Sequence, residues 1–541
     1  MEGFNKDLPI SDNLNTQHQM QRQMVQNNAF YMLIPEPLRQ YYIRFVRDFM
    51  WWYDGFVPYF HSQNSGIAPT RIAYTLLHKL ADITTGSKLL LDDSGTDTGE
   101  KVKYKGEEYI PIDFMEEWAK ECSLNTKVTQ AVEWSYAGGD SVIKLDNVMG
   151  NLMPKVLRKD EYWFSTDFSG RMSDITMYLY DRIHLTKDGQ QNQYYVVEQR
   201  RFDENNKPQY RVNVKIGTGA RPSYKDMDSN AYNVSDVKID QLPDDVRREF
   251  RSAFPKVMIG EWRDLPFKDS LGVYVLKASE KVSNMPALPF GESLLNNNVN
   301  ELATYDYYKS YFSGDMFLGK GMILIPENMQ DDSRFGGNLN QRVYHRIPYT
   351  ALEDQTPISI QFDLRASDWM TTRNNILQTF AMNFGVNERT ILTSIVPASE
   401  KPSAQEVTSD ENSTTLFVSN KRRLIKPQID KMFKDILNFY NVQEQYVRVK
   451  FSNLGVTNMA NTLNMAVLLK QNGLGDTRTL LEMIYTDKTN REIDVIEERL
   501  TKEKESKQKA EMEKAETKLF GDRTENELNK GKLNKIPNEE E

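Results

Sequence analysis

Residues 286–312 read PALPFGESLLNNNVNELATYDYYKSYF, and the second part of this stretch has a helical period. Its apolar side chains recur at spacings of three and four, as they do on one face of an α-helix. These side chains are Leu295, Val299, Leu302, Tyr305, Tyr308 and Phe312. The pattern predicts a helix from Leu294 to Phe312.

Short strand-like pieces follow this helix: GMILI from Gly321, RVYHRI from Arg342 and ISIQFDLR from Ile358. The next stretch, SDWMTTRNNILQTFAMNFG, is again helical, with Ser367 as its expected N-cap and Gly385 at its end. The sequence therefore predicts a helix, a small β unit and a second helix, in that order.

A polar loop, NERTILTSIVPASEKPS, leads from Asn387 into a long helical run from Ala404 to Tyr440. Pro427 lies inside this run. A proline there removes one backbone hydrogen bond and clashes with the carbonyl four residues earlier, so we expect a kink. A strand, VRVKF, and two further helical segments lead to Arg499. From Thr501 the charges alternate with almost no apolar face, which is typical of a solvated helix or a disordered tail.

The N-terminal half has two textures. Up to about Leu91 the patterns are helical, including the amphipathic run IAYTLLHKLADI, with Thr70 or Pro69 where its N-terminal cap belongs. From about Asp92 to Met285, β-branched and aromatic runs predict short strands. The clearest runs are VIKL, YWFS, ITMYLYDRIHL and YYVVEQRRF. DENNKP separates the last of these from QYRVNVKI and predicts a hairpin.

Length and composition limit the classes of protein to consider. The 541 residues leave room for two to four domains. Mean hydropathy is −0.63, no apolar run approaches the roughly 20 residues that span a bilayer, and the polar N-terminus predicts no signal peptide. One cysteine, Cys122, excludes an intramolecular disulfide and suits a reducing cytoplasm. A net charge of −9 disfavours a sequence-reading DNA binder but not a protein that DNA slides past.

Catalytic motifs are scarce. GTGARPS at Gly217 lacks the lysine of a phosphate-binding loop, and there is no GxSxG. The five histidines show no metal-binding spacing, and His78 in its helical run is expected to pack or cap. Cys122 lies in no protease-like context. We therefore expect no catalytic, cofactor or metal site, although catalytic groups assembled only in space would escape such a search.

In the order of these elements, the chain resembles the portal proteins of tailed bacteriophages over nearly its whole length, most closely in its C-terminal half. The strings that carry the resemblance are ALPFGESLL before a tyrosine-rich helix, FDLRASDWMTTRNNIL, NFGV, PSAQEVTSDENSTTLFVSNKRR, YVRVKFSNLG, and AGGDSVIKL followed by DFSGRMSDITMYLY. The resemblance implies an α+β portal fold with an α/β wing, a two-helix stem, a small β-containing clip, a long kinked wing helix and a helical crown.

These parts divide the chain as follows: 1–91, the N-terminal helical part of the wing; 92–293, the α/β wing; 294–316 and 366–386, the two stem helices; 317–365, the clip; 387–403, a tunnel loop; 404–458, the kinked wing helix and a wing strand; 459–500, the crown; 501–541, a charged tail expected to be disordered. Family crowns vary greatly in length, so the resemblance implies nothing about the role of the tail.

The resemblance also implies a function and partners. A portal protein is not an enzyme; it forms a ring, a dodecamer in the capsid, through which the genome is packaged and ejected. The implied partners are other copies of the chain, double-stranded DNA read without sequence specificity, the large subunit of the terminase motor, a head–tail adaptor, and the capsid and scaffolding proteins, with no membrane. The ring would be assembled in the host cytoplasm and lie in the virion.

Single residues can be named for the DNA channel. The loop tip Thr393, Ser394, Ile395 and Val396 is small and uncharged, so it would not hold phosphates as cations do; an ordinary surface loop is the alternative. Lys309, Lys320, Arg365 and Arg373 are candidate channel-lining cations. The alternatives are ion pairs across subunits and, for each one singly, an ordinary solvated charge.

Two other functions remain open. Another virion connector or minor capsid protein would share the lack of catalytic motifs but not the helix–β–helix order. A metal-dependent nucleic-acid-processing enzyme would need carboxylates clustered at the ends of strands.

Overall fold

The computed structural model describes residues 49–50, 52–55, 67, 69–86, 89–93, 101–148, 150–167, 170–185, 191–218, 235–237, 239–253, 260–281, 289–318, 322–326, 344–347, 358–360, 366–387, 404–442, 447–451, 459–472, 476–485, 488 and 490–532. The chain forms two compact units. The first comprises Met1–Thr85 and Gly95–Val447, and the second Gly86–Ser94 and Arg448–Glu541. Over the described residues, no helix has the length and apolarity that a membrane crossing requires.

The helices of the first unit are α3 (Ile72–Thr85), α4 (Pro111–Glu121), α5 (Leu124–Gly138), α6 (Asp244–Ala253), α7 (Val299–Leu318), α8 (Ala366–Phe384) and α10 (Ala404–Phe439), with short 3-10 turns η2 (Lys159–Glu161) and η3 (Ile239–Gln241). Its strands are β2 (Val102–Tyr104), β3 (Glu107–Tyr109), β4 (Asp140–Val148), β5 (Asn151–Leu157), β6 (Tyr162–Thr166), β7 (Met172–Leu185), β8 (Gln191–Phe202), β9 (Pro208–Thr218), β10 (Ser235–Val237), β11 (Arg263–Asp264), β12 (Val273–Lys277), β13 (Met322–Pro326), β14 (Tyr344–Ile347) and β15 (Ile358–Ile360). This mixture confirms the α+β class.

The first unit contains two larger antiparallel sheets. The larger has the order β10-β9-β8-β7-β6, with β11 also paired to β9, and the smaller has the order β12-β4-β5. The predicted strands and the β8–β9 hairpin are confirmed. In its turn, Asp203 Oδ1 accepts hydrogen bonds from the backbone N–H groups of Asn205 and Lys207, and Asn206 has a positive φ, as Asx turns do.

The core lies between these sheets and on the helix side of the smaller one. Strand β4 is buried on both faces, with Val142, Ile143 and Leu145 at 0–1 % exposure. Helix α5 packs on β4, β5 and β12, helix α3 packs on α5, and α10 packs on β12 and α3. A strand buried on both faces gives no alternating pattern, so its position in the middle of the layers emerges only from the structure.

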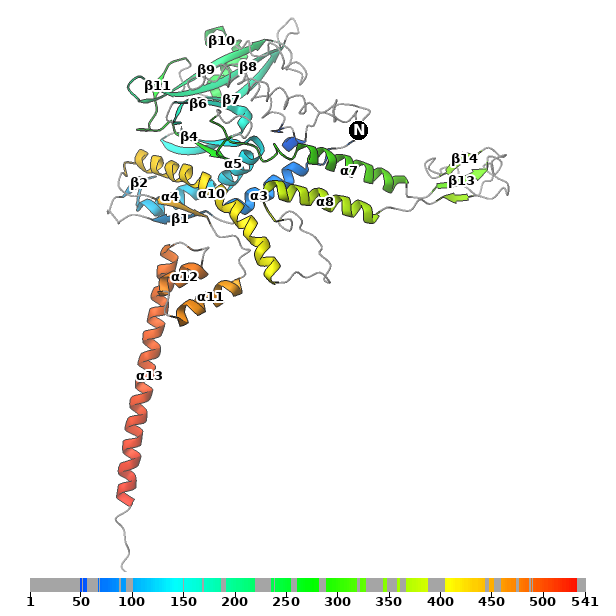
Figure 1. Ribbon diagram of the computed structural model, residues 1–541. Coiled ribbons are helices and arrows are strands. Elements are labelled where there is room, and N and C mark those ends of the chain that lie inside the picture. Colours follow the sequence, from blue (N-terminus) through cyan, green and yellow to red (C-terminus); the bar gives the residue numbers. More distant parts are fainter. Residues whose placement is uncertain are drawn as a thin grey trace, which may run out of the picture. The chain divides into compact units, whose positions relative to one another are not determined.

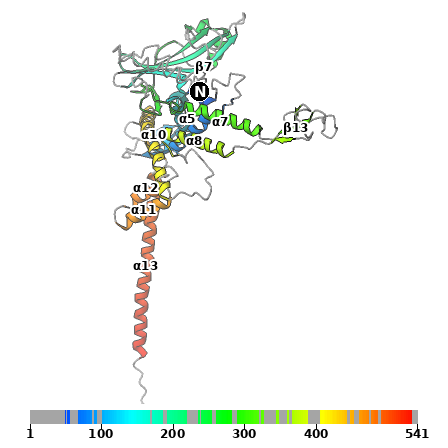
Figure 2. The same ribbon diagram turned by 45° about the vertical axis from the view of Figure 1, so that its right-hand side comes forward.

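Helices α7 and α8 confirm the predicted helix pair and lie side by side (Figures 1 and 2). Helix α7 starts at Val299 and not at Leu294, because residues 294–298 form turns. Gly385 ends α8 as predicted: its φ is 71°, and the N–H groups of Gly385 and Val386 bond back to Met382 and Ala381, the pattern of a Schellman cap. Ser367 is not the N-cap, since α8 already includes Ala366.

Between α7 and α8, the strand-like pieces form a three-stranded sheet of order β14-β13-β15, in which β13 and β14 are parallel. After α8, helix α10 is continuous from Ala404 to Phe439 with Pro427 inside it, and Figure 1 draws it with a change of direction. A kink at Pro427 itself stays a prediction. Asn441, with a φ of 66°, ends the helix with a second Schellman-type cap.

The second unit holds a two-stranded sheet of β1 (Leu89–Asp93) and β16 (Val447–Phe451), with helices α11 (Met459–Gln471), α12 (Thr477–Ile484) and α13 (Asn490–Lys532). Two expectations are corrected here. The N-terminal part up to residue 91 is not helical to its end, because Leu89–Asp93 pairs with a strand more than 350 residues later. The tail beyond residue 501 is helical to Lys532 rather than disordered. Its glutamates and lysines are strong helix formers, and Lys502 lies 3.9 Å from Glu498 one turn earlier.

Candidate functional site

The first candidate functional element is the pair α7 and α8, which we call the arm. Trp369 of α8 packs against the rings of Tyr308 and Phe312 of α7, with centroids 5.4 and 5.9 Å apart. Its indole Nε1 donates a hydrogen bond of 2.9 Å to Asp315 Oδ2. At the other end of α8, Asn383 Nδ2 donates to Asn298 Oδ1 at 3.0 Å. The two helices are therefore joined at both ends.

The arm buries one stripe and exposes another. Buried side chains of α8 come at helical spacing, namely Ile376, Leu377, Phe380, Ala381 and Phe384. Four large apolar side chains of the arm, Tyr311, Met316, Met370 and Met382, are 51–80 % exposed. Several large apolar side chains exposed on one element are typical of an interaction surface.

The sequence-predicted residues meet different outcomes. Lys309 and Arg373 lie on exposed positions of the arm, on α7 and α8 respectively. Lys320, Arg365 and the loop tip Thr393, Ser394, Ile395 and Val396 lie outside the described residues. Their roles at a channel stay predictions.

Residues 289–298 lie between β12 and α7 in the chain and lead into α7, and we call this segment the join. Helix α5 ends at Gly138 with carbonyls that lack partners of their own helix, as all helix ends do. The join supplies these partners: Ser293 Oγ donates to Ala137 O at 2.6 Å, and Leu294 N donates to Tyr136 O at 3.0 Å. The C-terminus of α5 is thus capped by the start of the arm.

A second connection ties α7 to the segment before α3. Thr70 donates from its N–H and its Oγ1 to Asp306 Oδ1, at 2.9 and 2.5 Å. Asp306 is buried, with 3 % exposure. Thr70 therefore contacts α7. It is not the N-cap of α3, because α3 begins at Ile72, two residues later.

Two glycines let the join approach the end of α5. A Cβ on Gly291 would lie well inside van der Waals contact of the carbonyl oxygen of Gly139, and a Cβ on Gly139 would clash with that of Gly291. Gly139 also has a φ of 95°, a conformation that side chains rarely adopt. Both positions therefore require glycine.

Asp140 contacts the join at the point where its backbone packs against the end of α5. Its Oδ2 accepts a hydrogen bond from Gly291 N at 3.0 Å, and its Oδ1 accepts one from the Tyr162 hydroxyl. Lys159 Nζ lies 2.7 Å from the same Oδ1, and both charged side chains are buried, at 2 % and 0 % exposure. The ammonium also lies 3.6 Å from the ring centroid of Phe290, in the join, a cation–π contact.

Burial lowers the pKa of Lys159 to about 8, although Asp140 acts in the opposite direction. Between this value and the ordinary 10.5, the unfolded chain binds more protons than the folded chain, so stability rises with pH. We expect the free energy of unfolding to rise by ~1–3 kcal/mol from pH 8 to 10.5 relative to Lys159→Met. Urea unfolding at several pH values measures this, with the exposed Lys155→Met as control. Parallel pH profiles for the wild type and Lys159→Met would contradict the expectation.

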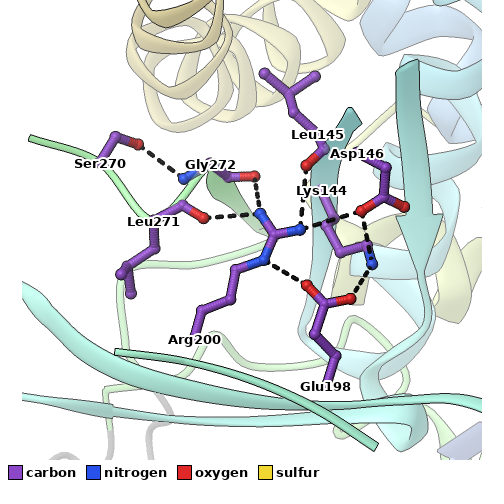
Figure 3. Close-up of polar contacts among 8 residues, drawn as sticks. All are labelled: Lys144, Leu145, Asp146, Glu198, Arg200, Ser270, Leu271 and Gly272. Carbon is purple, nitrogen blue, oxygen red and sulfur yellow. Dashed lines mark hydrogen bonds and ion pairs between the residues drawn. The ribbon is translucent and has the colours of Figure 1, made fainter. Parts of the chain in front are cut away.

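A second buried charge cluster joins the two sheets, and we call it the clasp (Figure 3). Arg200 of β8 reaches across to the smaller sheet: its Nη2 donates to Leu145 O and to Asp146 Oδ1, both at 3.1 Å. Its Nη1 donates to Leu271 O at 2.8 Å, and its Nε to Glu198 Oε1 at 2.6 Å. Every N–H direction of the guanidinium thus points at an acceptor on another segment or on its own strand.

The clasp is balanced in charge. Lys144 Nζ lies 2.6 Å from Glu198 Oε2 and 2.8 Å from Asp146 Oδ1. Although burial alone would raise the pKa of Glu198, the charges of Arg200 and Lys144 lower it. The clasp therefore places two cations opposite two carboxylates, and the two cations favour the ionised form of Glu198.

Sequence reasoning missed both charge clusters. Lys144 sits within the apolar run VIKL, and Glu198 and Arg200 alternate within VVEQRR. A charged residue inside an apolar strand was the feature of the sequence that could have indicated a buried ion pair. The sequence alone does not identify the residue it pairs with, because that residue comes from another sheet.

Helix α10 is anchored by two basic side chains. Lys421 Nζ donates to Ala278 O at 2.6 Å, and Arg422 Nε donates to Thr84 O at 2.8 Å, near the end of α3. Burial lowers the pKa of Lys421 to about 8. Tyr274 of β12 adds a hydrogen bond of 2.6 Å to Asp435. Helix α10 is thus fixed to the same layers as the join.

The remaining residues singled out from the sequence have structural contacts. His78 Nδ1 lies 2.9 Å from Glu133 Oε2, and that carboxylate also accepts from the Tyr53 hydroxyl; the imidazole is half exposed. The Cys122 thiol is buried and donates to Trp118 O, and burial raises its pKa to about 12. Within the described ranges there is no group of three or more His, Cys, Asp or Glu side chains that could hold a metal ion.

Comparison with known proteins finds a family match for part of the chain. Residues 283–510 match the family described as phage portal protein, SPP1 Gp6-like. No curated protein matches the chain. Two solved structures, the neck of an empty GTA particle and that of a native GTA particle, are each 10 % identical to this chain. The matches cover 76 % of this chain and 88 % and 89 % of the other chains, with TM-scores of 0.38 and 0.36. At these scores the two structures add nothing to the family match. The predicted resemblance to phage portal proteins is confirmed over residues 283–510, the part of the chain that matches this family.

Proposed function

We propose that the chain is the subunit of a portal ring at one vertex of a phage capsid, the channel for genome packaging and ejection. The observation that carries the proposal is the family match over 283–510. That range contains, in order, α7, the β13–β15 sheet, α8, α10, β16, α11, α12 and the first part of α13. A closed ring requires a head-to-tail interface whose rotation closes on itself.

In this proposal the arm is the stem, the β13–β15 sheet with its flanking loops is the clip, and residues 387–403 are the tunnel loop. The sheets, α5 and α10 form the wing, and α11 and α12 with the start of α13 form the crown. The exposed apolar side chains of the arm, such as Met370 and Met382, supply a surface for a neighbouring copy.

The proposed partners follow from this arrangement. Twelve copies form the ring in the capsid, double-stranded DNA passes without sequence specificity, and capsid and scaffolding proteins surround the wing. The clip, as the part between the two stem helices, docks the terminase large subunit and later the head–tail adaptor. Assembly takes place in the host cytoplasm, and the ring has no enzymatic activity of its own.

Negative-stain electron microscopy of the purified full-length protein tests the proposal directly. A ring with a central hole is the expected result, and a monomer or an irregular multimer would overturn it. The same preparation should hydrolyse no ATP. Hydrolysis abolished by a single substitution in this chain would also overturn the proposal.

Removing Thr393–Val396 is expected to leave rings intact and to reduce DNA packaging or retention by ~tenfold or more. The reason is that this uncharged tip is proposed to line the narrowest part of the channel, where no cation holds phosphates. Packaged DNA that resists nuclease is the readout, with a deletion in the polar segment 222–229 as control. Normal packaging, or cross-links that place the tip on the outer rim, would contradict the assignment.

A further inference from the structure

The join has more contacts than are needed to hold a short connecting segment. Gly291, Glu292, Ser293 and Leu294 each bond to a different group of the first unit, and the Glu292 N–H donates to Ser279 Oγ at 2.7 Å. Hydrogen bonds thus fix both the position and the orientation of four successive residues. These residues directly precede the arm.

A short path links the join to both arm helices. Asn298 Nδ2 donates to Leu294 O at 2.9 Å, and Asn298 O accepts from Leu302 N at 2.9 Å, in the first turn of α7. The Asn298 Oδ1 then accepts from Asn383 Nδ2 of α8 at 3.0 Å. The join is thus connected to α7 and α8 through Asn298.

The charge pair below the join is not explained by stability. Lys159 and Asp140 are fully buried, and taking both charges out of water costs several kcal/mol per ion. The lowered pKa of Lys159 has the same cause, burial of the charged form. Buried ion pairs of this kind can often be replaced by apolar groups of similar volume without loss of stability. We therefore look for the function of the Lys159–Asp140 pair in the positioning of the backbone that it contacts, because its burial costs desolvation free energy.

We propose that Asp140 is the positioning residue of the join: it fixes Gly291 and thereby the direction of α7 and α8 relative to the sheets and α5, while Lys159 holds the Asp140 side chain in place. In a ring, the same bond would set how closely the arms converge. The proposal concerns a single subunit, so its test does not depend on ring formation.

The test uses hydrogen exchange of the full-length protein, read by mass spectrometry over residues 289–303. The variant Asp140→Leu with Lys159→Met removes both charges and, with them, the acceptor for the Gly291 N–H and for the Tyr162 hydroxyl. We expect its free energy of unfolding in urea to fall by ~2–4 kcal/mol, because two buried donors lose their acceptor. Exchange over 289–303 should become ~tenfold faster, with α4 and β5 unchanged.

Two further variants make the test decisive. Asp140→Asn with Lys159→Met restores an uncharged acceptor and should return exchange to within ~twofold of the wild type. Lys101→Met with Glu108→Gln removes an exposed ion pair of 3.3 Å and should change nothing over 289–303. Unchanged exchange in the Leu/Met variant, exchange that rises uniformly along the chain, or failure of the asparagine to rescue would each overturn the proposal.

The direction of the arm can also be measured. Spin labels at Lys120→Cys on α4 and Lys309→Cys on α7, in labelled protein diluted into unlabelled protein, report the distance between the two elements. The buried Cys122 thiol, with its raised pKa, does not compete for the label. The distance distribution should broaden in the Leu/Met variant and narrow again in the Asn/Met variant. Identical distributions in all three proteins would show that Asp140 does not position the arm.

Discussion

Replacing Arg200 with methionine is expected to lower the free energy of unfolding by about 3–5 kcal/mol. The methionine leaves Glu198 beside Lys144 alone, and the carbonyls of Leu145 and Leu271 lose the donor that crosses between the sheets. Urea unfolding of the full-length protein measures the loss.

The neighbouring Arg201 provides a matched control on the opposite face of the same strand. It is exposed and stacks on the ring of Trp262 at 4.0 Å, so Arg201→Met should cost no more than ~1 kcal/mol. Adding Glu198→Leu to Arg200→Met leaves the Lys144–Asp146 pair balanced and should recover ~1–2 kcal/mol. If Arg200→Met unfolds within ~1 kcal/mol of the wild type, the clasp contributes nothing net and the expectation is wrong.

The helical segments could be predicted because each buries one stripe. The run from Leu295 to Phe312 and the run from Ile376 to Phe384 show the spacing of three and four that a half-buried helix requires. Gly385 could be assigned for the same local reason, since a left-handed residue is needed to end a helix in this way. Local rules were sufficient wherever the partner lay within a few residues.

The clasp and the join could not be predicted, because their partners are distant in sequence. Asp140 follows the end of α5, and its partner Gly291 lies 151 residues later. The glycine pair 138–139 and the glycine of PFGES were visible in the sequence. Nothing in either string says that the two backbones cross. For the tail, the sequence left a solvated helix and a disordered segment as alternatives for another reason: without an apolar face, only helix propensity and charge pairs favour α13, and these signals are weak.

Gly291→Ala is the second large effect that we expect. Its methyl group would enter the space of the Gly139 carbonyl oxygen, and neither backbone has room to retreat. On one side, Gly139 O accepts the Ala278 N–H at 2.8 Å, and the next residue, Asp140, is held by Tyr162 and Lys159. On the other side, Ser293 is bonded to the end of α5. The join must therefore shift as a whole.

We expect Gly291→Ala to lose about 2–4 kcal/mol of stability, as overpacking against fixed backbone does. Because the join leads into α7, the yield of rings seen by negative-stain microscopy should fall by ~tenfold as well. Gly314→Ala is the matched control: it lies within α7, a Cβ there meets nothing within 4 Å, and the exchange should add ~0.5–1 kcal/mol of stability. A Gly291→Ala protein that unfolds and assembles like the wild type would show that the backbone of the join can shift to accommodate a methyl group, and that the contact at Gly291 does not position the arm.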